Sequence, residues 1–149
     1  MTDHQEQIIR EAHVVDSTGI EFRKRCIEAV SRLSGYDWSG VYRLEGSELV
    51  LDAYVGDPTE HDRIQVGQGV CGTAVATGSN QLIDDVRVLE NYLSCSVDTR
   101  SEIVVLIRDP EDPSRILGQI DIDSHAPSRF GATDEQFLES LAILMARRW

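Results

Sequence analysis

Apolar residues recur at helical spacing near both ends of the chain and alternate with polar residues between them. A narrow stripe in residues 3–15 and a stronger one in residues 21–33 place apolar side chains three or four positions apart, which predicts two helices. A third helix is expected after Thr133, because Thr133 and Gln136 have the spacing of a capping box and an apolar face follows. We therefore expect helices at both ends of the chain.

The middle of the chain has the period of two that is typical of strands, with one short helix expected at residues 70–77. The strands are expected at residues 38–43, 49–55, 63–66, 81–83, 102–108 and 116–123. A charged, proline-rich loop at 109–114 joins the last two, which are expected to be antiparallel neighbours. This order predicts an α+β fold, in which an antiparallel sheet has the N- and C-terminal helices packed on one face and a pocket on the other.

Size and charge limit the classes of function. The formal net charge of −12 argues against nucleic-acid or anionic-membrane binding, which needs clustered Lys and Arg. We expect no membrane association, because no apolar run approaches the length of a bilayer span and the polar start is unlike a signal peptide. The three cysteines do not form a secreted disulfide framework, which favours a cytoplasmic location. We expect one domain over residues 1–149, with 1–18 as an N-terminal helical extension.

The three cysteines have different sequence environments. Cys26 lies on the apolar face of a predicted helix, which is typical of a buried core thiol. Cys71 follows a glycine-rich turn at the start of a short helix, where the helix dipole favours a thiolate, although a small buried residue fits the position equally well. Cys95 lies in a polar segment, a poor place for a structural thiol and a good one for a reactive thiol. We therefore interpret Cys95 as functional.

Three carboxylates lie in or next to strand-like segments. Strand alternation places Asp121 and Asp123 on one face, and Glu102 begins the strand expected beside them. On an acidic protein this face could simply be solvated. Trp38 and Tyr42 point to one face of the first strand, where they could form the apolar wall of a site whose polar groups are the carboxylates, or pack in the core. We favour a site, since carboxylates in a pocket cost desolvation energy unless they bind something.

Other site types have little support in the sequence. The glycines of Gly67–Gly72 have the GxGxxG spacing, but no βαβ unit surrounds them, so a dinucleotide fold is not expected. The chain lacks a GxxxxGK[ST] phosphate loop and a GxSxG elbow. The four histidines are scattered and no CxxC or HExxH spacing occurs, so the sequence predicts no metal site.

At this point the motifs resemble those of the free methionine-R-sulfoxide reductases, a single-domain branch of the GAF fold. The two cysteines 24 residues apart, with a glutamate seven positions after the second, carry most of the resemblance. The matching segments are Trp38–Tyr42, Val66–Ala74, Cys95, Ser101–Val105 and Leu117–Ser124, in the order of the family. The resemblance spans most of residues 20–149.

The resemblance implies a role for each candidate residue. Cys95 matches the catalytic cysteine. The carboxylates that hold the substrate match Glu102, Asp121 and Asp123, and the aromatic wall around its thioether end matches Trp38 and Tyr42. It also implies a free methionine sulfoxide substrate, thioredoxin as reductant and no cofactor. Family members carry a further cysteine where this chain has His61, so the oxidised Cys95 is resolved either by Cys71 or by an external thiol, and we expect Cys71.

Two other functions compete with the reductase. Most GAF domains are sensory modules that bind a small ligand or sense oxidants without turnover, and this chain could be one. A structural dimerisation domain would use the N-terminal helices, but it leaves the thiol and carboxylate groups unexplained. A homodimer is compatible with the reductase as well.

Overall fold

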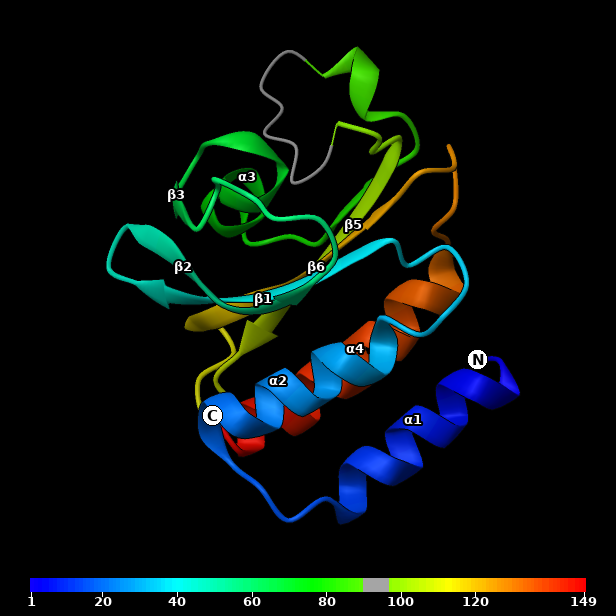
Figure 1. Cartoon of the computed structure of the whole chain (residues 1–149). Coiled ribbons are helices and arrows are strands. Elements are labelled where there is room, and N and C mark those ends of the chain that lie inside the picture. Colours follow the sequence, from blue (N-terminus) through cyan, green and yellow to red (C-terminus); the bar gives the residue numbers. More distant parts are fainter. Residues whose placement is uncertain (90–96) are drawn as a thin grey trace.

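The structure is a computed structural model that describes residues 1–89 and 97–149, and the described residues form a six-stranded antiparallel sheet. The strand order across the sheet is β3-β2-β1-β6-β5-β4. The strands are β1 (Trp38–Glu45), β2 (Glu48–Val55), β3 (Arg63–Gln65), β4 (Gln81–Ile83), β5 (Ser101–Arg108) and β6 (Ile116–Ser124). All six expected strands are present. The curled sheet separates two layers of the molecule (Figure 1).

The helices are divided unequally between the two faces of the sheet. Figure 1 shows α2 (Gly19–Val30) and α4 (Ala132–Arg147) against one face, with α1 (Asp3–Val14) packed outside them. The short helix α3 (Gly69–Thr77) lies on the opposite face, and the 3₁₀ turn η1 (Val86–Val88) follows β4. The predicted fold class is therefore confirmed. No described helix combines the length and apolar character that a membrane span requires.

The start of α4 differs from the prediction. The helix begins at Ala132 rather than after Thr133, and Gly131 is its N-cap. The carboxylate of Asp134 accepts a hydrogen bond of 3.0 Å from the Gly131 backbone N–H. Asp134, the third residue of the helix, therefore accepts a hydrogen bond from the N-cap N–H at the start of α4. The spacing in the sequence had predicted this capping role for Thr133 and Gln136.

The main core lies between the sheet and the helices α2 and α4. The register pairs Ile103 with Ile122 and Val105 with Ile120, so these side chains point to the same face. All four are completely buried, and they pack with apolar residues of α4 in one cluster. The α4 residues are Phe137, Leu138, Leu141, Leu144 and Met145, the face expected from the sequence. This layer is an apolar platform that fixes β5 and β6.

A buried polar contact holds α1 against this platform. The Gln5 side chain donates a hydrogen bond of 3.3 Å to Asp134 Oδ1, and the Tyr36 hydroxyl donates one of 2.7 Å to the same oxygen. Burial, followed by the bond to Asp134, raises the pKa of Tyr36. The N-terminal segment is thus fixed by a specific hydrogen-bonded contact as well as by its apolar stripe.

Candidate active site

The face of the sheet that carries α3 brings the three predicted carboxylates together. Glu102 on β5 pairs directly with Asp123 on β6, and Asp121 lies two residues along β6 on the same face. Their exposures are 2%, 1% and 0%, so this face is not solvated as an ordinary acidic surface would be. Three carboxyl groups are therefore buried side by side.

A thiol from another element joins this group. The Sγ atom of Cys71 on α3 lies 4.0 Å from Glu102 Oε2, at the outer limit of an S–H···O contact. The side chains of Glu102 and Cys71 also hydrogen-bond to Asp121. Cys71, the carboxylates and the apolar side chains of Val104 and Leu106 thus share one face of the sheet. We call Cys71, Glu102, Asp121 and Asp123 the thiol–carboxylate cluster.

The glycine motif before Cys71 fixes this helix close to its own loop. A side chain at Gly72 would place its Cβ 2.5 Å from the carbonyl oxygen of Gln65, a distance that only glycine avoids. The Gly67 N–H donates a hydrogen bond of 2.9 Å to the Gly72 carbonyl. The spacing that resembles a dinucleotide motif therefore closes the turn that presents Cys71.

Burial controls the electrostatics of the cluster. Desolvation raises the pKa of Asp121, although hydrogen bonds from Glu102 and Cys71 act in the opposite direction. The pKa of Asp123 is raised well above its usual range, first by desolvation and then by the neighbouring charge of Asp121. The cluster therefore retains protons at pH values where exposed aspartates are ionised. A retained carboxyl proton is what a general acid needs.

Trp38 and Tyr42 lie on the same face as the cluster, across β1 and β6. The register pairs Trp38 with Asp123 and Tyr42 with Gln119, and both aromatic side chains are fully buried. The Trp38 ring crosses Gly40, where a Cβ would lie 2.4 Å from the ring, and it stacks on Tyr54 with centroids 5.7 Å apart. The absence of a side chain at Gly40 therefore allows the ring to lie flat along the strand.

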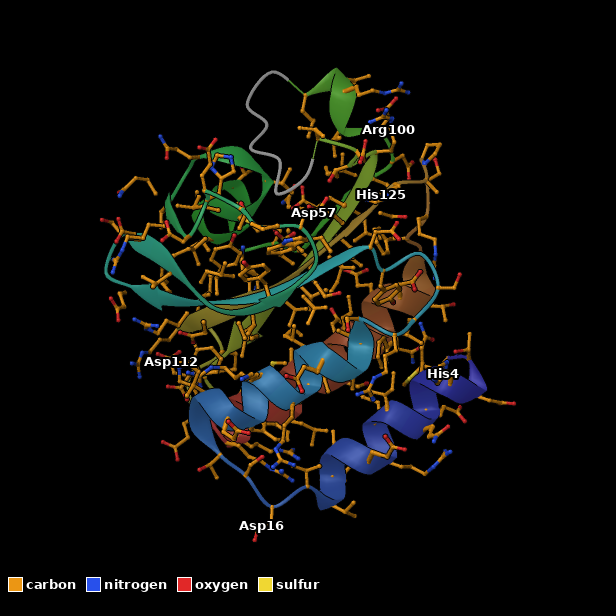
Figure 2. All side chains as sticks on the ribbon, in the orientation of Figure 1. His4, Asp16, Asp57, Arg100, Asp112 and His125 are labelled. Carbon is orange, nitrogen blue, oxygen red and sulfur yellow. The ribbon has the colours of Figure 1, made fainter. Side chains whose placement is uncertain are left out.

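The polar atoms of both aromatics hold the loop between β2 and β3. Trp38 Nε1 donates a hydrogen bond of 3.1 Å to the Asp57 carbonyl, and the Tyr42 hydroxyl donates one of 2.9 Å to the His61 carbonyl. Figure 2 shows Asp57 on the α3 side of the sheet. His61, the position where the resemblance leads us to expect a cysteine, is therefore joined through its backbone to the aromatic wall.

Cys95 lies outside the described residues, so its relation to the cluster stays a prediction. The chain that follows it is described from Val97 onward. There, the hydroxyl of Thr99 is buried and donates a long hydrogen bond of 3.4 Å to Asp123 Oδ2. The Arg100 N–H donates a bond of 2.8 Å to the Ser124 carbonyl. Residues shortly after Cys95 are thus attached to the end of β6 that carries Asp123.

The sequence analysis missed Gln119, a buried polar residue on this face. Gln119 precedes Asp121 by two positions, pairs with Tyr42 and Leu106, and has no exposed surface. Within the described part of the chain, neither its Oε1 nor its Nε2 has a hydrogen-bond partner. The alternation that identified the aspartates also places Gln119 on their face, but an isolated amide gave no chemical signal.

A cavity with a volume of about 570 Å³ lies elsewhere, between α2 and β2. It is lined by Lys24, Asp52 and Tyr54 among others and contains none of the predicted site residues. The buried carboxylate of Asp52 already forms ion pairs with Arg23, at 3.0 Å, and Arg43. Its charge is therefore neutralised by the protein, and the cavity presents no comparable reactive group.

Comparison with known proteins shows the family of this chain. The sequence profile of the GAF domain matches residues 20–149. The free methionine-R-sulfoxide reductase of Escherichia coli (strain K12) is 42% identical over 116 residues, which are 78% of this chain and 68% of that protein. This chain belongs to the GAF domain family, in the branch of the free methionine-R-sulfoxide reductases. It spans about two thirds of the length of the curated relatives it matches.

Solved structures of this branch resemble the whole fold. A free methionine-R-sulfoxide reductase from Neisseria meningitidis, solved in complex with its substrate, is 30% identical with a TM-score of 0.86. The match covers 98% of this chain and 86% of that one. A type II free methionine-R-sulfoxide reductase from Thermoplasma acidophilum is 34% identical with a TM-score of 0.78, over 97% and 94% of the two chains. The fold of this branch therefore extends over nearly all of this chain.

Proposed function

We propose that this protein reduces free L-methionine-(R)-S-oxide to L-methionine by cysteine chemistry. The observation that carries the proposal is the buried thiol–carboxylate cluster on the α3 face, beside Trp38 and Tyr42. Family membership and the named activity of the relatives support the same conclusion. In the proposed reaction the sulfoxide sulfur is the electrophile, and the cluster supplies recognition and the proton.

The charge of the cluster explains why the substrate would be a free amino acid. A free methionine sulfoxide carries an ammonium group, which a residue inside a peptide lacks. Carboxylates favour that cation, and their burial strengthens the attraction because the local dielectric constant is low. Trp38 and Tyr42 would form the apolar wall around the thioether end. We therefore expect strong discrimination against peptide-bound methionine sulfoxide.

The first chemical step would form the bond between the Cys95 sulfur and the sulfoxide sulfur. A protonated carboxyl group of the cluster donates its proton to the sulfoxide oxygen, and the raised pKa of Asp121 and Asp123 supports this role. The S–O bond of the adduct then breaks, and the oxygen leaves as water with the protons of the Cys95 thiol and of the carboxyl group. A water molecule attacks the Cys95 sulfur, which breaks the S–S bond, releases methionine, returns one proton to the carboxylate and leaves Cys95 as a sulfenic acid. The sulfoxide is reduced by two electrons, and the Cys95 sulfur is oxidised by two electrons.

The second step would restore the thiol. Cys71 condenses with the sulfenic acid of Cys95, which releases water and forms a disulfide. Thioredoxin reduces this disulfide with two electrons and two protons, and it leaves as its own disulfide. The position of Cys71 in the cluster supports its role as the resolving thiol. Because His61 occupies the family's usual cysteine position, the alternative to Cys71 is an external thiol.

We also infer the setting of the reaction. Residues 1–149 would act as one GAF domain with residues 1–18 as a helical extension, and α1 packing on α4 supports this division. The cytoplasm would supply thioredoxin and keep the thiols reduced. The stripe on residues 8–15 and the C-terminal helix α4 would provide the contact of a homodimer. Light scattering on the purified chain tests the last point, and a monomer at all concentrations would contradict it.

Steady-state turnover with a thioredoxin system tests the proposal. We expect reduction of the free R-sulfoxide, and rates at least about 100-fold lower for the S-epimer and for a methionine sulfoxide inside a peptide. The Cys71→Ser variant should complete one turnover and then stop, whereas Cys26→Ser should turn over normally. Unchanged turnover of Cys71→Ser would exclude its resolving role. Sulfoxide binding without methionine formation would indicate a sensory module instead.

A further inference from the structure

The thiol–carboxylate cluster also has the composition of a metal site. One ligand atom each from Cys71, Glu102 and Asp121 lie within 4.8 Å of one another, and all three residues are buried. They come from three different elements, α3, β5 and β6. In the sequence, Cys71 and Glu102 are 31 residues apart, and Glu102 and Asp121 are 19 residues apart. The sequence contains no metal motif at these residues, because the fold and not local spacing brings the three ligands together.

Asp123 provides a second, separate observation. Its carboxyl group has 1% exposure, and its Oδ1 atom has no hydrogen-bond partner among the residues that the structure describes. Asp123 is the direct cross-strand partner of Glu102 and shares a hydrogen bond with it. A buried oxygen of this kind costs free energy until a proton donor or a cation satisfies it. Because Asp123 lies beside Glu102, a cation held by the other three residues could satisfy this oxygen as well.

We propose that Cys71, Glu102 and Asp121 form a binding site for a divalent cation of the zinc class, with Asp123 beside Glu102 as the candidate fourth ligand. A thiolate with carboxylate oxygens suits a borderline-soft ion such as Zn²⁺. Bonds of about 2.3 Å to sulfur and about 2.0 Å to oxygen place tetrahedral ligands roughly 3.5 Å apart. The present distance of 4.0 Å between Cys71 Sγ and Glu102 Oε2 needs only a small closure. Mg²⁺ requires an octahedron of oxygens and bound waters, which this buried set does not provide.

Binding of the cation would exchange protons for metal. The Cys71 thiol must lose its proton to become a ligand. Under the proposed function the same carboxylates recognise the substrate, so a bound cation would exclude methionine sulfoxide. That consequence rests on the proposed function, whereas the metal site itself does not.

Cobalt(II) is the probe that tests the site, because a Co²⁺–thiolate bond gives a charge-transfer absorption band. The reduced full-length chain is titrated with Co²⁺ without oxygen, and we expect one equivalent to produce this band. Zn²⁺ should remove the band by displacement, and a large excess of Mg²⁺ should not. Asp121→Asn should weaken binding by at least about 10-fold, since even second-shell changes cost that much.

The cysteine variants decide which thiol binds the metal. Cys71→Ser should lose the band, and Cys26→Ser should keep it, since Cys26 is buried in the helix-side core. Circular dichroism verifies that each variant is folded. Absence of the band in the wild type, its persistence in Cys71→Ser, or its loss only in Cys95→Ser would overturn the proposal. Sulfoxide reduction is measured separately with a chelator present, so failure of the reductase function would leave the metal result intact.

Discussion

The two faces of β5 and β6 are equally buried but carry side chains of opposite character. On the helix side, Ile103, Ile120 and Ile122 have no exposed surface and pack against α4. On the α3 side, the intervening positions of the same strands carry Glu102 and Asp121, which are as deeply buried. Burial of isoleucine stabilises the fold, whereas burial of a carboxyl group costs free energy. This difference agrees with the proposed function, which places the chemistry on the α3 face and leaves the helix face to stabilise the fold.

Among substitutions that distinguish the two faces, that of Asp121 on the α3 face should have the largest effect on catalysis. We expect Asp121→Asn to lower kcat/KM for free methionine-R-sulfoxide by about 10²- to 10⁴-fold. The amide can neither bind the substrate ammonium group as a carboxylate does nor donate a carboxyl proton to the sulfoxide oxygen. The free energy of unfolding should stay equal or rise. The matched control is Asp16→Asn, since Asp16 is exposed in the loop between α1 and α2 and points away from the sheet (Figure 2). Full activity of Asp121→Asn would remove this residue from the site.

Truncation on the opposite face should have the reverse outcome. Ile120→Ala creates a cavity in the helix-side core, and we expect a loss of about 2–5 kcal/mol in the free energy of unfolding by urea. The folded fraction should keep its turnover, since the side chain points away from the cluster. Ile143→Ala on the exposed side of α4 provides the control and should change stability by less than about 0.5 kcal/mol. A selective loss of turnover in Ile120→Ala would show that the two faces are coupled.

Gln119 tests how much free energy of unfolding is lost when polar atoms are buried on the α3 face. Both side-chain polar atoms are buried and lack partners among the described residues. Gln119→Leu has a similar volume and removes the unsatisfied amide, so we expect the free energy of unfolding to rise by about 1–3 kcal/mol. Gln136→Leu, at an exposed position of α4, is the control and should have little effect. Destabilisation by Gln119→Leu would mean that the amide is satisfied in solution.

The pH dependence of stability also distinguishes the two faces of β5 and β6, because only the α3 face of these strands carries buried carboxyl groups. The folded protein raises the pKa of Asp123 above the usual value of 3.8, so the folded state holds a proton that the unfolded state releases. This contribution to stability is present below pH 3.8 and is lost as the pH rises through the raised pKa. Relative to Asp123→Asn, the wild type should therefore lose stability as the pH increases, by at most about 1.4 kcal/mol per pH unit. Parallel curves for the two proteins, measured by urea unfolding, would contradict the raised pKa.

Part of the layout of the two faces was predictable from the sequence, because alternation placed Asp121 and Asp123 on one face of β6 and Ile120 and Ile122 on the other. Trp38 and Tyr42 were likewise expected on one face of β1, but the register of β1 with β6 was needed to show that it is the face of the aspartates. Contacts made by the fold were not predictable. The approach of Cys71 to Glu102 depends on how the glycine turn packs, and the ring of Trp38 depends on the empty space at Gly40.

Gln119 and the start of α4 show a second limit. Gln119 belongs to no reactive motif, and only the measured burial identifies it as unusual. Thr133 and Gln136 fit a capping box by spacing, but Asp134 competes for the same role and wins because its carboxylate reaches the Gly131 N–H. Local patterns therefore identify elements and faces, while the choice among neighbouring polar groups depends on tertiary contacts.

Single-turnover reduction tests the central claim most directly. The reduced wild-type protein is mixed with excess free methionine-R-sulfoxide, without thioredoxin, and the methionine released is counted. We predict about one methionine per chain from the wild type and from Cys26→Ser, and none from Cys95→Ser, because one thiolate supplies the two electrons of each turnover. Equal methionine release by Cys95→Ser, or none by the wild type, would contradict the claim that the α3 face is a thiol-dependent reductase site.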